Sequence, residues 1–348
     1  MVPEVRLTVL GSLNMDISVT VPELPGPGAT VLGGGAAYAP GGKGANQAVA
    51  AARLGARVRM VGCVGDDDFG GRLRAALQDE GIDDGGVRTV PGSPTGLAMI
   101  TVDESGENMI TVAPGANREV GATEIAAVAA GASPAAGQVP ADTSGTPAPR
   151  EVLVISAEIP ADAIKTALAV DGRILRILNL APAPPSAREL VAGADWLVVN
   201  ESEAASVLGR PVDGLTAAVA SAAELTELGA CHVVVTAGAE GAAYCARPDG
   251  GGSTGDGGSS AGKAVAVPGF RIRAVDTVGA GDTFVGALAV ALGAGTAPEE
   301  AVRAACAAGA AAASRPGTQS GMPGPAEILT ATGFTWPLTS APRSSSPR

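Results

Sequence analysis

Short apolar runs alternate with helix-like stretches along the second half of the chain. The runs hold three to five residues, and the segments between them carry apolar positions at helical spacing. The runs cover 152–155, 174–178, 196–199 and 233–235, and the helical segments cover 161–170 and 217–228. This alternation predicts a parallel sheet with helices packed on both faces.

The N-terminal part predicts strands of two kinds. Strands at 7–10 and 58–61, with a helix at 43–54 between them, fit the same parallel sheet. The remaining strands are short and separated by glycine, proline and aspartate, which predicts a small β appendage beside the main body. These strands cover 17–21, 31–33, 97–102 and 109–112.

Together these elements predict one α/β domain over residues 1–336, with three layers and a mostly parallel central sheet. We expect the appendage from about 14–40 and 92–112. The segments 131–150 and 247–262 are predicted to be low-complexity loops, because alanine, proline, glycine and serine bury little apolar area. The tail at 337–348 is rich in serine, proline and arginine and is predicted to be disordered.

Charge and cysteine content exclude several classes of function. A formal net charge of -12 argues against a nucleic-acid surface, so we expect no nucleic-acid partner. Zinc sites and histidine-dependent triads are poor explanations, because His232 is the only histidine and the cysteines lack metal-ligand spacing. The cysteines are Cys63, Cys231, Cys245 and Cys306. Reduced, buried thiols are typical of a cytoplasmic protein.

Neither a signal peptide nor a membrane span is predicted. No N-terminal stretch combines a basic start, an apolar core and a small-residue cleavage site, which again favours a cytoplasmic location. The weakly apolar region at 301–313 is too short for a bilayer span and is interrupted by Arg303 and Gly309. We therefore expect a packed helix there and no membrane partner.

A glycine-rich turn near the C-terminus is the first candidate for chemistry. It runs from Gly279 through Ala280 and Gly281 to Asp282, between an apolar strand end and a helix start. Small residues let the backbone approach a ligand, and the N–H groups of the first helical turn attract an anion. Asp282 could take a proton from a hydroxyl beside those amides. The alternative is an ordinary connection with Asp282 as a helix cap.

A second cluster lies near the N-terminus. Asn14 and Asp16 follow the first strand, and a Gly-Gly-Lys-Gly-Ala-Asn-Gln run at 41–47 precedes the first helix. Short polar side chains such as Asn46, next to close-approaching glycine backbone, suit a polyol, and Lys43 adds a mobile cation. The run is not a P-loop, because its spacing differs from that motif. Taken singly, these residues could also be turn formers and a solvated lysine.

The two clusters, in this order, resemble the signatures of the ribokinase, or pfkB-type carbohydrate kinase, family. The resemblance extends from about Leu7 to Gly321. Further matching segments are Gly62 to Asp67 with Phe69-Gly70, Pro114 to Asn117, Asn179 to Ala183, Val199 to Glu203, Thr236 to Gly241 and Val267 to Phe270. The resemblance implies a ribokinase-like fold, in which the β appendage is a lid over the sugar, and a homodimer formed through that lid.

The resemblance also implies roles for the two clusters. Asp282 would be the base, and the amides of Gly279, Ala280, Gly281 and Asp282 would form an anion hole for the transferring phosphoryl group. Sugar contacts would come from both the N-terminal cluster and a later acid. These residues are Asn14, Met15, Asp16, Gly42, Lys43, Gly44, Ala45, Asn46 and Glu158. From the residues alone, Glu158 could equally be an acid at a helix start.

Nucleotide and metal sites follow from the same resemblance. ATP would contact Asn200, Thr236, Ala237, Gly238, Ala239, Glu240, Gly241, Gly281, Asp282 and Cys306. Glu203 would organise Mg²⁺ through water, since Mg²⁺ keeps several waters. K⁺ would be held mainly by backbone carbonyls at Asp276, Val278, Ala312, Arg315, Gly317 and Gly321. Gly321 stands where relatives commonly have serine, and Cys306 where they often have histidine or asparagine.

Several functions remain open at this point. The form of the 41–47 run is closest to kinases of D-ribose, which would phosphorylate its 5-hydroxyl, and the alternative is another furanose such as deoxyribose or a nucleoside. Few aromatic residues are available to wall a nucleobase, which favours a bare sugar. A dinucleotide-dependent oxidoreductase lacks its G-x-G-x-x-G fingerprint here. A catalytically idle sugar-binding protein is disfavoured because Asp282 is present.

Overall fold

A computed structural model describes residues 4–131, 151–170, 174–247 and 262–338. In these residues, nine strands form one sheet in the order β13-β12-β11-β10-β9-β8-β1-β4-β5. The strands are β1 (Arg6–Leu10), β4 (Arg57–Gly65), β5 (Asp83–Val90), β8 (Glu151–Ser156), β9 (Ile174–Asn179), β10 (Trp196–Asn200), β11 (His232–Thr236), β12 (Gly241–Ala246) and β13 (Val265–Pro268). In this sheet the seven strands β11, β10, β9, β8, β1, β4 and β5 pair in parallel, and β12 and β13 add an antiparallel edge.

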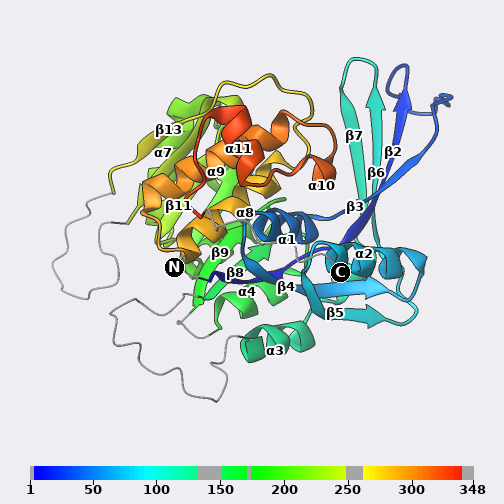
Figure 1. The fold of residues 1–348 in the computed structure, drawn as a ribbon, viewed down its shortest axis with the longest axis horizontal. Helices are drawn as coiled ribbons and strands as arrows, with labels where there is room; N and C mark the ends of the chain where they lie inside the picture. Colours follow the sequence, from blue (N-terminus) through cyan, green and yellow to red (C-terminus); the bar gives the residue numbers. More distant parts are fainter. Residues whose placement is uncertain (1–3, 132–150, 171–173, 248–261, 339–348) are drawn as a thin grey trace, which may run out of the picture.

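Helices cover both faces of this sheet, as Figure 1 shows. One face carries α1 (Lys43–Arg53), α2 (Asp68–Asp79), α8 (Ala280–Gly293), α9 (Pro298–Ala313) and α11 (Pro325–Thr332). The other carries α3 (Ala122–Gly131), α4 (Ala161–Leu168), α5 (Ala187–Leu190), α6 (Glu201–Leu208) and α7 (Gly214–Glu227). Alternate residues of the strands point into two separate apolar clusters, so both faces are buried and the predicted three layers are confirmed.

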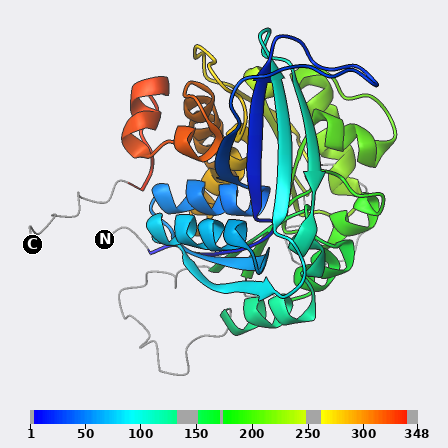
Figure 2. The ribbon, with the colours of Figure 1, turned by 90° about the vertical axis from the view of Figure 1, so that its right-hand side faces the viewer.

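The small lid sheet stands at the carboxyl edge of the central sheet. It contains β2 (Asn14–Val21), β3 (Ala37–Gly41), β6 (Gly96–Asp103) and β7 (Asn108–Ala113), in the order β3-β2-β6-β7. The chain leaves the end of β1 and enters β2 within a few residues, which fixes the lid beside that edge. Figure 2 shows the lid in front of the α/β body.

One predicted lid strand is wrong. Residues 31–33 have no regular structure, and the strand that pairs with β2 is β3, further along the chain. Residues 33–35 are three glycines, which add no side chain to a sheet face. Gly34 makes one bond to the Thr20 carbonyl (2.8 Å), whereas Ala37–Gly41 pairs with Asn14–Ser18 over its whole length. The longer paired run therefore forms the strand.

Other predictions fall largely outside the described residues. These are the loops at 131–150 and 247–262, of which 132–150 and 248–261 lie outside, and the tail, of which 339–348 lies outside. At the start of that tail, Leu338 is buried against the core. The 301–313 region is the packed helix α9, as predicted. Among the described helices, none combines the length and apolar character needed to cross a bilayer.

Candidate active site

The glycine-rich turn forms the start of helix α8, as its sequence predicts. Gly279 is the N-terminal cap residue and has φ of 79°, in the left-handed region that glycine tolerates. A Cβ there would lie 2.8 Å from Thr318 Cγ2, whereas a Cβ on Gly281 would meet nothing within 4 Å. Gly279 is thus fixed by conformation and packing, and Gly281 faces open space.

The amides of this turn are partly free. The Gly279 carbonyl accepts from the Thr283 N–H (2.8 Å), and the Ala280 N–H donates to the Thr277 carbonyl (3.2 Å). Within the described part of the chain, the N–H groups of Gly281 and Asp282 have no backbone acceptor. They lie at the positive end of the helix dipole and are available to an anion.

Asp282 is held by two buried amides from helix α1. Asn46 Nδ2 donates to Asp282 Oδ2 (2.9 Å), and Gln47 Nε2 donates to Asp282 Oδ1 (3.1 Å). Asp282 is buried, with 7% of its surface exposed. The predicted catalytic residue and part of the predicted sugar site therefore meet, although more than 230 residues separate them.

The N-terminal cluster gathers around Glu158. Ser12 Oγ donates to Glu158 Oε2 (2.6 Å), and the Lys43 backbone N–H donates to the same oxygen (3.3 Å). Asn14 is buried at the start of β2, where its Oδ1 accepts from Asn117 Nδ2 (2.8 Å). The Glu158 carboxylate therefore anchors the loop that carries Lys43.

Backbone geometry explains several glycines of the 41–47 run. Gly42 has φ of 89°, and a Cβ there would lie 2.7 Å from the Asn14 N atom. A Cβ on Gly44 would lie 2.7 Å from the Ser12 N atom, and the Ala45 N–H donates to the Ser12 carbonyl (3.0 Å). The two chain segments thus pack backbone to backbone. Met15 is completely buried, and its side chain packs in the core.

Electrostatic shifts show that the charged residues converge. Burial, with added repulsion from Glu158 and Asp282, raises the pKa of Asp16 to about 7. The nearby Asp282 carboxylate is the main cause of the raised pKa of Lys43, with contributions from Glu158 and Glu203. These residues come from segments far apart in the sequence. Their mutual influence places one cation among several acids.

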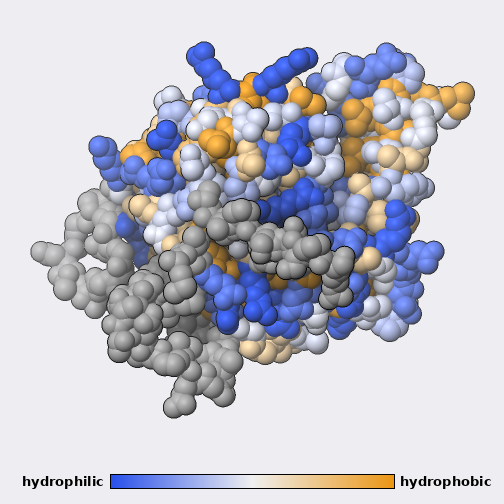
Figure 3. Space-filling model, viewed as in Figure 1, coloured by the Kyte–Doolittle hydropathy of each residue, from blue (hydrophilic) through white to orange (hydrophobic). Residues whose placement is uncertain are grey.

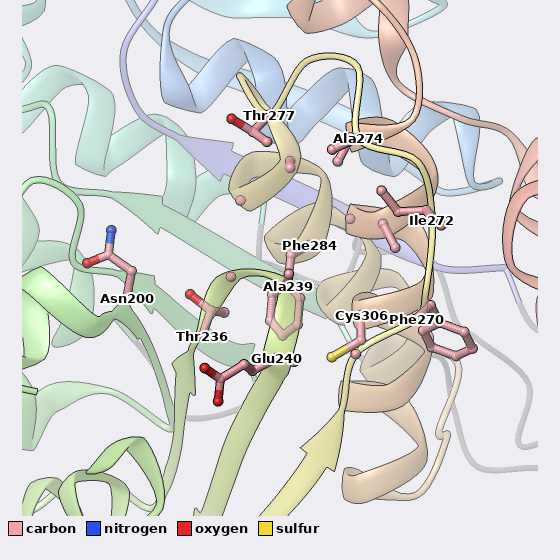
Figure 4. Close-up of a pocket in the computed structure, with 18 of the residues that line it drawn as sticks. Asn200, Thr236, Ala239, Glu240, Phe270, Ile272, Ala274, Thr277, Phe284 and Cys306 are labelled. Carbon is pink, nitrogen blue, oxygen red and sulfur yellow. The ribbon is translucent and has the colours of Figure 1, made fainter. Parts of the chain in front are cut away.

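A large cavity opens beside Gly281. Its volume is about 960 Å³, and Figure 4 shows its walls. Most of the predicted nucleotide residues line it, namely Asn200, Thr236, Gly238, Ala239, Glu240, Gly241, Gly281 and Cys306. Ala237 and Asp282 are absent from the lining, and Ala237 is buried in the core beneath. The cavity is roomy enough for a nucleotide.

Polar and apolar walls of the cavity are separated. Asn200, Thr236 and Glu240 line one side, whereas Phe270 and Cys306 line the other (Figure 4). Ile272, Phe284, Gly309 and Ala310 also line the cavity. Sequence reasoning missed these apolar residues apart from Phe270, which ends one of the family-like segments. Burial raises the pKa of the Cys306 thiol to about 12, so Cys306 acts here as a small apolar side chain.

Glu203 caps helix α6 from within. The Asn200 N–H donates to Glu203 Oε2 (2.8 Å), and the Glu203 N–H donates to Asn200 Oδ1 (2.9 Å), forming a capping box. Burial is the main cause of its raised pKa, and the Asp282 carboxylate adds to it. A buried acid whose charge is unfavourable fits a position next to a cation.

Two loops meet where the K⁺ site was predicted. The Asp276 carboxylate accepts from the Val278 N–H (3.0 Å) and the Gly317 N–H (2.9 Å), which ties the loops together. In the described residues, the carbonyls of Asp276, Val278 and Arg315 accept no backbone N–H. Such free carbonyls fit a K⁺ ion.

Other carbonyls of this region are already engaged. The Ala312 carbonyl accepts from the Arg315 N–H (3.0 Å), and the Gly317 carbonyl accepts from the Gly321 N–H (3.1 Å). A Cβ on Gly321 would lie 3.2 Å from the Pro316 carbonyl oxygen, so a larger residue would be tight there. Among the described residues, no group of three His, Cys, Asp or Glu side chains could hold a metal.

Comparison with known proteins decides the family. Residues 5–325 match the pfkB family carbohydrate kinase. The chain belongs to this family. The family and its phosphotransferase class were both predicted from the sequence, and both are confirmed.

Individual relatives cover nearly the whole chain. A ribokinase of Haemophilus influenzae is 35% identical over 93% of this chain and 97% of its own length. A deoxyribokinase of Salmonella typhi is 32% identical over 81% of this chain and 84% of its own. The structure of Arabidopsis thaliana ribokinase complexed with ribose and ATP is 28% identical, with a TM-score of 0.76 over 96% of this chain and all of the other. This likeness confirms the predicted fold.

Proposed function

We propose that this chain transfers the γ-phosphoryl group of ATP to the 5-hydroxyl of D-ribose, giving ribose 5-phosphate and ADP. The observation that carries this proposal is the position of Asp282, whose carboxylate is bound by the amides of Asn46 and Gln47 and which follows Gly281, a residue that lines the cavity. The relatives named ribokinase, and the fold shared with a ribokinase that binds ribose and ATP, support the choice of substrates.

In the proposed reaction, an Asp282 oxygen takes the proton of the 5-hydroxyl as the hydroxyl oxygen of the sugar attacks the γ-phosphorus. The new O–P bond forms as the bond between the γ-phosphorus and the bridging oxygen breaks, and ADP leaves. The Gly281 and Asp282 N–H groups stabilise the charge on the phosphoryl oxygens, a contribution of about 3 kcal/mol per donor. Lys43 lies among the acids, and its ammonium group would help to stabilise the same negative charge on the phosphoryl oxygens.

The sugar would be held by the residues around Glu158. Asn14, Asp16 and Glu158 each offer oxygen acceptors. The backbone of Gly42 to Gly44 lies against the segment that carries Ser12 and Asn14. Short side chains on packed elements have little freedom. They therefore suit a small ring with several hydroxyls.

Two cations fit the residues present. Glu203, buried and next to the cavity residue Asn200, would hold the waters of Mg²⁺, which neutralises phosphate charge. The free carbonyls of Asp276, Val278 and Arg315, with Ala312, Gly317 and Gly321 nearby, would hold K⁺ beside the anion hole. K⁺ there would support the positive potential at the start of α8.

The alternative substrate is another furanose, and the deoxyribokinase relative favours 2-deoxyribose as the second candidate. A panel of D-ribose, 2-deoxyribose, adenosine and fructose, read by coupled ADP detection, separates the two proposals. The highest kcat/KM is expected with D-ribose. Turnover of a nucleoside or of 2-deoxyribose without turnover of ribose would overturn the leading choice.

We also propose a homodimer formed through the lid, in the cytoplasm. The strand β7 is exposed over its whole length, and Figure 3 shows apolar side chains gathered over the lid. The large exposed apolar residues there are Leu32, Tyr38, Met99, Met109, Ile110 and Val112. Light scattering should give the mass of two chains, and Ile110→Lys should give the mass of one.

A further inference from the structure

Gln47 is a completely buried polar residue next to the proposed base, and the reaction described above assigns it no step. Its Nε2 donates to Asp282 Oδ1 (3.1 Å) and to Asn179 Oδ1 (2.9 Å). Its Oε1 has no hydrogen-bond partner in the described part of the chain. A buried polar atom without a partner costs about 1–3 kcal/mol, so its packing alone does not account for this residue.

The orientation of the Gln47 amide is set by a backbone carbonyl. Asn179 Nδ2 donates to the Val198 carbonyl (3.3 Å), and a carbonyl can only accept. Asn179 must therefore turn its Oδ1 toward Gln47, and Gln47 must turn its Nε2 toward both Asn179 and Asp282. This series of hydrogen bonds runs from Val198 in β10 through Asn179 in β9 and Gln47 in α1 to Asp282, the proposed base, at the start of α8.

The two amides on Asp282 differ in what they can do. Asn46 is part of the predicted sugar site, keeps 5% of its surface exposed, and is also bound by Gln319 Nε2 at its Oδ1 (3.0 Å). Gln47 is 0% exposed and has no path to a ligand. A substrate hydroxyl can therefore displace the bond of Asn46 to Oδ2, whereas the bond of Gln47 to Oδ1 stays.

We propose that Gln47 is a positioning residue that clamps Asp282 by Oδ1, so that Oδ2 faces the substrate hydroxyl, with Asn179 acting through Gln47. This inference rests on the proposed function of Asp282 as the base. Misplacement of a reacting group by about 1 Å can cost roughly 10²-fold in rate. Loss of the clamp should therefore lower kcat and leave sugar binding in place, because Gln47 does not touch the sugar.

The test is Gln47→Met, which keeps an unbranched side chain of similar length and removes both donors. We expect kcat to fall about 10- to 100-fold while the KM for ribose changes less than about threefold. The matched control is Ser156→Ala, which removes another completely buried polar atom that has no hydrogen-bond partner within the described residues. Its kcat should stay within about twofold of wild type.

A double-mutant cycle tests the route through Asn179. Asn179→Ala should lower kcat by itself, and adding it to Gln47→Met should lower kcat no further, because both changes release the same clamp. If Gln47→Met fails to fold, Asn179→Ala alone carries the test, with an expected loss of about fivefold or more in kcat at unchanged KM.

Failure of this inference can be told from failure of the proposed function. An active wild type with an equally active Gln47→Met variant, or a variant whose loss lies wholly in KM, would refute the role of Gln47. A wild type without furanose kinase activity would refute the proposed function and the positioning role that depends on it.

Discussion

The two regions proposed to hold the sugar and the nucleotide are built in opposite ways. Around Asp282, buried amides such as Asn46 and Gln47 form a connected network of hydrogen bonds between fixed elements. The cavity beyond Gly281 instead has a long apolar wall that includes Phe270 and Cys306. Polar networks select by direction, whereas apolar walls select by shape. We therefore expect the protein to be strict toward its acceptor and tolerant toward the base of its nucleotide.

The largest effect is expected at the centre of the polar network. Asp282→Asn keeps the size of the side chain and removes the proton acceptor, so turnover should fall about 10²-fold or more, with sugar affinity nearly unchanged. The matched control is Asp213→Asn, because Asp213 caps helix α7 on the surface without a side-chain hydrogen bond. Unchanged turnover in Asp282→Asn, measured by coupled ADP release, would remove Asp282 from the role of base.

A smaller effect is expected at the boundary between the two regions. Glu203→Gln retains the side chain needed for the capping box and removes the charge proposed to hold the waters of Mg²⁺. The Mg²⁺ concentration for half-maximal activity should rise about fivefold to tenfold. Glu224→Gln, on the exposed side of α7, makes the same change in net charge and should have no effect. Equal Mg²⁺ requirements in both variants would exclude Glu203 from that role.

The polar region should also make stability depend on pH. The folded state raises the pKa of Asp16 to about 7, so it holds this proton more tightly than the unfolded chain does. The contribution of Asp16 to the stability of the folded state is therefore fully present below about pH 4 and is lost as the pH rises to about 7.

Asp16→Asn is neutral at every pH and should escape this loss. The Tm of the variant relative to wild type should therefore increase by roughly 3–6 °C between pH 5 and pH 8, and its KM for ribose should rise. Thermal scans without ligand measure the first effect. A difference in Tm that is the same at both pH values would show that Asp16 ionises normally.

The smallest effect is expected on the apolar side. Cys306 lies seven residues, or about 10 Å along α9, from Ala313, whose carbonyl binds the Val275 N–H (2.8 Å) near the anion hole. In the proposed complex with ATP, that distance would put Cys306 near the base of the nucleotide. Apart from the exposed Arg271, the wall here lacks polar side chains among the described residues.

The kcat/KM values for ATP and GTP should therefore differ by less than about tenfold, since hydrogen-bonded pockets discriminate far more strongly than apolar ones. Cys306→Asn adds a directional group and should change this ratio with the KM for ribose unaltered. A wild-type preference for ATP above about a thousandfold would contradict the contrast between the two regions.

Much of the architecture could be predicted because it follows from periodicity. Apolar runs alternating with helices predicted the parallel sheet, and Asn200 and Thr236, which end β10 and β11, both line the cavity. The lid register could not be predicted in this way. Which segment pairs with β2 depends on bonds across the lid, and the run at 31–33 carries no sign of lacking a partner.

The clamp on Asp282 also escaped prediction, although Gln47 stands next to a predicted site residue. Neighbouring helix residues point about 100° apart, which suggests different surroundings for Asn46 and Gln47. Both reach Asp282 because its carboxylate has two oxygens, one for each amide. That geometry depends on how α1 packs against α8. A linear pattern does not contain it.

The most direct test is a crystal structure with D-ribose and a non-hydrolysable ATP analogue. We predict the 5-hydroxyl within about 3 Å of Asp282 Oδ2, Gln47 still bound to Oδ1, and the γ-phosphate against the Gly281 N–H. Ribose bound in a separate cavity, with its 5-hydroxyl out of reach of Asp282, would contradict it.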